Sequence, residues 1–394
     1  MMPVSRAMPK RSAGFPASRF PLPASRAGAR ALLVALSLCA GNVSAQLPAK
    51  LSDSAFWKLV TDISEPGGMF RSDNFVSNEI TYQWVIPDLL HTTKPGGVYL
   101  GVGPDQNFTY IVALKPKMAI IFDIRRQNML THLMYKALIE QSTDRADFVS
   151  RLFARPRPPG LDSTSTPEAI FAAFATVPPD SARFRRTITG IRDWLKKTHG
   201  FGLSDEDLST IAYVYEAFVT WGPDITYNSN TRNAFGRGSM PSYAALQVAT
   251  DSDRVHRSYM STEATFRALK EMETNNLLIP VVGDFAGPKA IRAAGQYLKE
   301  RKATVTAFYL SNVEQYLFNQ GDDAHNFFEN VATLPLDSSS TFIRSVFNMM
   351  PYSRAPMIGP YMRGQQMLAS MLAQLTLFKE GKLSQYLDVI QTSR

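Results

Sequence analysis

The chain has 394 residues, of which 45% are hydrophobic and 19% are charged, a balance typical of a folded globular protein and not of a disordered one. Its formal charge is +8, but residues 1–45 hold six of the 42 basic side chains and no acidic one, so the rest of the chain is nearly neutral. This distribution argues against a nucleic-acid-binding protein.

The first 45 residues have the pattern of an export signal. A basic stretch precedes the apolar segment 31–40, and the small residues Val43, Ser44 and Ala45 form a cleavage motif. We therefore predict a signal peptide over 1–45, cleaved after Ala45, and a periplasmic or secreted protein. A cytoplasmic protein is the alternative if the leader is not used. No apolar run reaches the roughly 18 residues that span a bilayer, so no transmembrane span is expected.

The segment before the first predicted strand combines short helices with a polar loop. The spacing of apolar residues predicts a helix over 51–61 and a second over 80–90. Between them, residues 63–79 hold a Pro-Gly-Gly turn and many polar side chains, among them Asn78 and Glu79. This loop is a candidate lid over a ligand, and a solvated, turn-rich loop is the plainer alternative.

From residue 97 the pattern changes to alternating strands and helices. Four apolar runs predict strands: 98–102, 117–123, 277–284 and 303–310. Helices are predicted after them and at the C-terminus, over 106–114, 126–141, 288–301, 312–320 and 363–379. A mainly helical insertion is predicted at about 141–275. This order predicts an α/β fold in one domain over 46–394, a Rossmann-like, largely parallel sheet with both faces covered.

Polar residues follow all four predicted strands. In a parallel sheet the carboxyl ends of the strands meet at one edge, and ligands bind in the crevice beyond them. The candidate ligand-binding residues are therefore those at the strand ends: Gly101, Gly103, Asp105, Asp123, Asp284, Ser311 and Asn312. Asp123 follows Gly101 by 22 residues, a spacing that suits a carboxylate accepting hydrogen bonds from ribose hydroxyls. Gln106 stands where the dinucleotide fingerprint needs a third glycine, which argues against NAD.

The first two strands and their ends resemble a known family. The run Val98-Tyr-Leu-Gly-Val-Gly-Pro-Asp105, followed by Ile120-Ile-Phe-Asp123, is similar to motifs I and II of the class I S-adenosylmethionine-dependent methyltransferases. In that family the glycine-rich turn passes under the amino-acid part of the cofactor, and the acid of the second strand holds the ribose. The resemblance implies the first role for Gly101 and Gly103 and the second for Asp123. It also implies S-adenosylmethionine as cofactor and methyl transfer to an unassigned acceptor.

The whole chain further resembles uncharacterised bacterial proteins of methyltransferase-like fold, through its Ser-Glu-Pro-Gly-Gly and Ser-Asn-Glu segments. It departs from the methyltransferase pattern in lacking the acid that often precedes the glycines. Ser311 and Asn312 stand where a substrate-side motif is expected. Export also conflicts with a cofactor that is made and kept in the cytoplasm. An exported, non-catalytic binding or interaction protein on a Rossmann-like fold is therefore the alternative.

The sequence does not single out a catalytic residue. Glu79, Asp284 and Glu314 are candidates for taking a proton from an acceptor, and Asn78, Glu79, Ser311 and Asn312 are the substrate or lid candidates. Plainer roles in tight turns or helix caps stay open for the glycines, Asp123 and Asp284. The five histidines form no metal-binding motif, so no metal site is predicted. A small-molecule ligand is expected, and the oligomeric state is left open.

Overall fold

The computed structural model describes residues 46–230, 240–347 and 364–394. The predicted signal peptide and its cleavage site after Ala45 lie outside the described residues. Within the described parts of the chain, no helix is both long enough and apolar enough to cross a membrane.

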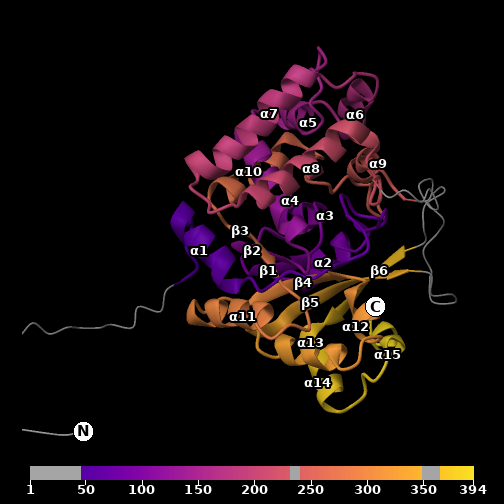
Figure 1. The fold of residues 1–394 in the computed structure, drawn as a ribbon. Coiled ribbons are helices and arrows are strands. Elements are labelled where there is room, and N and C mark those ends of the chain that lie inside the picture. Colours follow the sequence, from indigo (N-terminus) through magenta and orange to yellow (C-terminus); the bar gives the residue numbers. More distant parts are fainter. Residues whose placement is uncertain (1–45, 231–239, 348–363) are drawn as a thin grey trace, which may run out of the picture. The chain divides into compact units, whose positions relative to one another are not determined.

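A six-stranded mixed sheet lies at the centre of the fold (Figure 1). Its strands are β1 (Val98–Val102), β2 (Met118–Asp123), β3 (Leu278–Val282), β4 (Val305–Ser311), β5 (Leu336–Phe347) and β6 (Gly364–Ser370). They are ordered β3-β2-β1-β4-β5-β6, with β1 to β5 parallel and β6 antiparallel to β5. Every residue of β1, β2 and β3 is buried, as expected for apolar runs without polar alternation. The prediction of an α/β fold with a largely parallel sheet is confirmed.

The C-terminal strand differs from the prediction. The sequence predicted one helix over 363–379, but residues 364–370 form β6 and the helix α14 begins only at Met371 and ends at Lys379. β6 pairs along its whole length with β5. This pairing overrides the local preference of Met and Leu for helix, because strand formation depends on cross-strand and sheet contacts that a local pattern does not contain.

Helices lie on both sides of the sheet (Figure 1). On one side are α3 (Gln106–Leu114) and α4 (Arg126–Gln141), with the helices between α4 and β3 packed against them. Those helices are α5 (Arg145–Leu152), α6 (Pro167–Ala175), α7 (Ser181–Asp193), α8 (Asp205–Trp221), α9 (Tyr243–Val248) and α10 (Glu263–Thr274). The other side carries α11 (Ala290–Glu300), α12 (Val313–Leu317), α13 (Asp323–Val331), α14 and α15 (Tyr386–Gln391). The first two helices of the described chain are α1 (Asp53–Ile63) and α2 (Ile86–Thr92).

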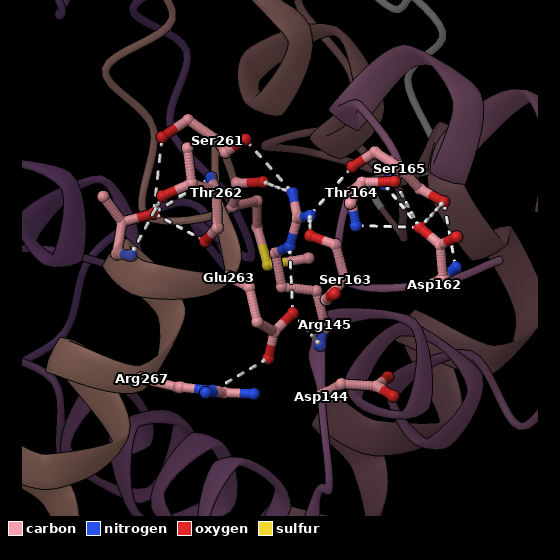
Figure 2. Close-up of polar contacts among 12 residues, drawn as sticks. Asp144, Arg145, Asp162, Ser163, Thr164, Ser165, Ser261, Thr262, Glu263 and Arg267 are labelled. Atoms are coloured by element: carbon pink, nitrogen blue, oxygen red, sulfur yellow. Dashed lines mark hydrogen bonds and ion pairs between the residues drawn. The ribbon is translucent and has the colours of Figure 1, made fainter.

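A buried arginine connects three parts of the helical segment between α4 and β3 (Figure 2). Arg145, the first residue of α5, donates from Nε to the Glu263 carboxylate at 3.2 Å. Its other four guanidinium N–H groups donate to backbone carbonyl oxygens, those of Ser163, Ser165, Met260 and Ser261. Its side chain is only 2% exposed, and all five donors have partners, which is the condition under which a guanidinium can be buried.

Candidate functional site

A cavity of about 220 Å³ lies at the carboxyl ends of the first four strands. Residues after each of these strands line it: Gly103 after β1, Asp123 at the end of β2, Gly283 and Asp284 after β3, and Ser311 and Asn312 at the end of β4. β1 and β4 are neighbours in the sheet, and the chain runs outward from them in opposite directions. Such a point, where the strand order reverses, opens a crevice in parallel sheets.

One wall of the cavity is the polar segment 64–79. The sequence marked residues 63–79 as a candidate lid, but Ile63 is the last residue of α1. Backbone hydrogen bonds fix it to the sheet, with the Glu65 N–H donating to the carbonyl of Val282 at 3.1 Å and the Gly68 N–H to that of Ile124 at 2.7 Å. From this segment Asn78 and Glu79 line the cavity, as do Met69, Phe70, Asn74 and Ser77. Segment 64–79 is thus a structured wall of the cavity and not a freely solvated loop.

Asp123 lines the cavity, but its carboxylate is largely occupied by the chain itself. Its Oδ1 accepts hydrogen bonds from the backbone N–H (2.8 Å) and Nε (3.1 Å) of Arg125, and its Oδ2 accepts from Nη2 at 2.9 Å. A carboxylate offers about four acceptor positions, so about one is left for a ligand. Arg125 also donates from Nη1 to the carbonyls of Ser72 and Asp73. The pair therefore joins the end of β2 to segment 64–79.

The two glycines of the predicted cofactor turn have different roles. Gly101 lies inside β1 and does not line the cavity, and a Cβ there would overlap the Oδ1 of Asn107. Gly103 lines the cavity with φ +81°, a left-handed conformation that glycine adopts without strain. Its carbonyl accepts from Asn107, Asn128 and His132 at 2.9–3.1 Å. Gly101 thus serves the packing of the turn, and Gly103 forms part of the cavity surface.

Asp105 lies beneath the turn, away from the cavity, and is 1% exposed. Its Oδ2 accepts from Gln247 at 2.9 Å and from the Tyr259 hydroxyl at 3.0 Å. Burial raises the pKa of this carboxyl to about 7. Asp105 therefore connects α3 to the helical segment before β3, and the structure gives it no direct access to a ligand in the cavity.

Glu79 is a buried carboxylate at the edge of the cavity, with 2% of its surface exposed. Its Oε1 accepts from the Ser311 hydroxyl at 2.5 Å, and its Oε2 accepts from the Ser345 hydroxyl at 2.5 Å and from Gln366 at 3.4 Å. Burial raises the pKa of Glu79, and these hydrogen bonds offset the effect only in part. A raised pKa makes the ionised carboxylate a stronger proton acceptor than an ordinary one.

The other two proton-acceptor candidates differ in access. Asp284 lines the cavity, where its Oδ1 accepts from the Ala286 N–H and its own N–H donates to Glu65. Glu314 points away from the cavity and is buried in a double hydrogen bond with Arg344, at a side-chain exposure of 2%. The structure thus keeps Asp284 and Glu79 as candidates and removes Glu314.

Asn74 Oδ1 and Gln106 Oε1 are buried acceptors in the cavity wall, and neither has a hydrogen-bond partner within 46–230, 240–347 and 364–394. Phe70 and Tyr316 meet edge to face at 5.6 Å and add an apolar surface beside them. A ligand with hydrogen-bond donors and an apolar or aromatic part matches this combination. Sequence reasoning noted Gln106 only as a missing glycine and gave Tyr316 no role. In the described residues, no three His, Cys, Asp or Glu side chains are placed to hold a metal ion.

The structure brings most of the predicted site residues together. Seven of them line the cavity: Asn78, Glu79, Gly103, Asp123, Asp284, Ser311 and Asn312. Gly101 and Asp105 do not.

Residues 74–392 match the model of a family described as a domain of unknown function, DUF7790. The chain belongs to this family. The matched range includes β1 to β6 and every residue that lines the cavity except Met69 and Phe70. No curated protein matches the sequence significantly.

Proposed function

We propose that the cavity binds a nucleoside-type ligand, with S-adenosylmethionine as the first candidate, and that the protein is a methyltransferase-like protein with a Rossmann-like fold. The observation that carries this proposal is the position of the cavity. It lies where the strand order 3-2-1-4-5-6 reverses, beyond the carboxyl ends of β1 and β4, and dinucleotide-binding sheets of this order hold their ligands at that point. The antiparallel direction of β6 distinguishes this sheet from an all-parallel one.

The polar groups of the cavity fit the hydrogen-bond donors of such a ligand. S-adenosylmethionine presents an ammonium group, two ribose hydroxyls and an adenine amine. The unpartnered Asn74 Oδ1 and Gln106 Oε1 are acceptors, and Asp284 adds a carboxylate. Asp123 keeps about one acceptor position, so it would hold one ribose hydroxyl and not the two that its spacing predicts.

In methyl transfer the cofactor supplies the methyl group, and the chain has to position an acceptor and exclude water. Segment 64–79 would provide the exclusion, since its backbone is fixed across the ends of β2 and β3. Glu79 would hold the proton that the acceptor releases, because it is buried, lines the cavity and has a raised pKa.

Calorimetric titration of the full-length protein with S-adenosylmethionine and S-adenosylhomocysteine tests the proposal. Micromolar binding is expected. Gln106→Leu should weaken it about threefold to tenfold, the scale of one hydrogen bond, and Asp284→Ala should weaken it more because a charged acceptor is lost. Asp193→Asn, at an exposed carboxylate on α7, is the control and should bind like the wild type. Folded protein that binds neither compound would refute the nucleoside proposal.

A non-catalytic binding protein is the second candidate, and the Asp123–Arg125 pair favours it. Three of about four acceptor positions on the predicted ribose carboxylate are used within the chain. A binding protein needs no residue to take a proton. Glu79→Gln should therefore bind the ligand as the wild type does, and the wild type should methylate no added substrate. The predicted signal peptide also favours this candidate. It would export the protein to a compartment without S-adenosylmethionine, where a methyltransferase would lack its cofactor.

A further inference from the structure

We propose that Ser311 is a nucleophile activated by Glu79, and that this pair gives the protein an ester-cleaving activity that proceeds through an acyl-Ser311 intermediate. The proposal is independent of a nucleoside ligand, because it rests on the β4 end of the cavity and its hydrogen bonds. It concerns a different reaction from methyl transfer and can be tested without any cofactor.

Ser311 has the backbone position of an exposed nucleophile. It is the last residue of β4, and α12 begins two residues later, so it lies on a sharp strand-to-helix turn. Its φ is +51°, a strained left-handed conformation that serine rarely adopts. Strain of this kind on a strand-to-helix turn presents the serine hydroxyl of α/β-hydrolases at the end of the sheet. Here Ser311 lines the cavity and is only partly buried.

Glu79 is placed as the base for this hydroxyl. Its Oε1 accepts a hydrogen bond from the Ser311 hydroxyl at 2.5 Å. Its Oε2 accepts from the Ser345 hydroxyl at 2.5 Å and from the Gln366 amide at 3.4 Å, and these two bonds orient the carboxylate. A nucleophile in hydrogen-bond contact with a base that a further group orients is the arrangement of activated serines. No ion pair among the described residues includes Glu79, so no cation there neutralises the carboxylate. Its raised pKa agrees with this role.

The reaction balances with an ester and water as the only reactants. The Ser311 Oγ forms a bond to the ester carbonyl carbon while its proton passes to the Glu79 Oε1. The carbon–oxygen bond to the alkoxide then breaks, and the alkoxide takes the proton from Glu79 and leaves as the alcohol. Water then attacks the acyl carbon and gives its proton to Glu79. The bond from that carbon to the Ser311 Oγ breaks, and Glu79 returns the proton to Oγ, which releases the carboxylic acid and restores Ser311 and ionised Glu79. Apolar side chains beside the site, Phe70, Tyr316 and Leu317, suit an ester with an apolar acyl group.

Ser345 provides a matched control within the same cluster. Its hydroxyl also donates to Glu79 at 2.5 Å, but it is completely buried in β5 and does not line the cavity. A substrate or probe in the cavity can therefore reach Ser311 and not Ser345. If the carboxylate merely made serines reactive regardless of position, the two would be labelled alike.

The test is labelling of the full-length protein by an alkyl fluorophosphonate, with the modified residue identified by peptide mass spectrometry. The serine oxygen displaces fluoride from phosphorus, and the proton passes to Glu79. We expect one adduct on Ser311 and none in Ser311→Ala. Ser345→Ala should still be labelled on Ser311, but more slowly, because it loses a hydrogen bond that orients Glu79. Glu79→Gln should slow labelling by about 100-fold or more, the scale of a general base.

The wild-type labelling rate is the second measurement, and it does not depend on the folding of any variant. It should rise with pH as Glu79 loses its proton and then level off. Folded wild-type protein without an adduct on Ser311, an adduct on Ser345 instead, or a labelling rate that does not change with pH would each overturn the proposal. None of these outcomes depends on S-adenosylmethionine binding, so failure here and failure of the proposed function are separate results.

Discussion

Replacing Arg145 by Met tests whether one buried guanidinium holds the helical segment between α4 and β3 together. The change removes five hydrogen bonds, one of them to the Glu263 carboxylate, and keeps much of the side-chain volume. The side chains of Arg145 and Glu263 are 2% and 10% exposed. Without the guanidinium, the Glu263 carboxylate keeps the backbone N–H of residue 145 at 3.4 Å and the exposed Arg267 at 3.7 Å (Figure 2).

The expected loss of stability follows from the charge that is left behind. Breaking a buried ion pair by removing one partner costs about 3–5 kcal/mol, because the remaining charge stays desolvated. The carbonyl groups of Ser163 and Ser165 lie near exposed residues and can form hydrogen bonds with water instead. The loss of their hydrogen bonds to Arg145 therefore adds little to the cost of the unpaired charge. We therefore expect Arg145→Met to lower the free energy of unfolding by about 4 kcal/mol.

Urea unfolding followed by circular dichroism, with linear extrapolation to water, measures this loss. Arg267→Met is the matched control, since it removes the other, 71% exposed partner of the same carboxylate and should cost less than about 1 kcal/mol. A cost for Arg145→Met below about 1 kcal/mol, or equal to that of the control, would refute the reasoning. Arg145→Met combined with Glu263→Leu should recover much of the loss, because no unpaired charge remains.

Two further predictions concern the pH dependence of stability. Burial lowers the pKa of His199, but its hydrogen bonds to Glu140 and Asp53, both 2.7 Å, outweigh this and leave the pKa raised above 6.5. The stability that protonated His199 contributes is therefore complete below pH 6.5 and is lost as pH rises through the folded-state pKa. In urea titrations at pH 5 to 9, the stability of His199→Gln should lack this fall with rising pH. Burial raises the pKa of Glu273 from 4.5 to about 8, so its contribution is present below pH 4.5 and is lost between pH 4.5 and 8. Glu273→Gln should flatten the slope over that range by up to about 1.4 kcal/mol per pH unit, and an unchanged slope would contradict this.

The part of the site that local sequence encodes was predictable. The strands β1 and β2 are short apolar runs, and a residue that lines the cavity stands at the end of each: Gly103 directly after β1, and Asp123 as the last residue of β2. Parallel strands bring such ends to one edge, so the pattern gives both the fold class and the position of the site. The helix predicted over 364–370 was wrong for the opposite reason. The conformation of this segment depends on pairing with the distant strand β5, which local sequence does not contain.

The partners of individual side chains were beyond local sequence. Glu79 is held by Ser311, Ser345 and Gln366, which lie 232 to 287 residues further along the chain, on β4, β5 and β6. No periodicity or motif connects these positions. The pairing of Asp123 with Arg125 is local, but an acid followed two residues later by a base is common, and only the fold shows that both are buried at the cavity edge.

The cavity has two ends that are formed by different strands. At the β2 and β3 end, Asp123 and Asp284 supply acceptors, and Arg125 joins the sheet to segment 64–79. At the β4 end, Ser311 and Glu79 form a proton-transfer pair supported from β5 and β6. Glu79 itself belongs to the segment that Arg125 holds, so a ligand that draws the Asp123 carboxylate away from Arg125 would loosen the backbone that leads to Glu79. We therefore predict that a ligand at the first end changes the rate of Ser311 labelling, and an unchanged rate on ligand binding would contradict this.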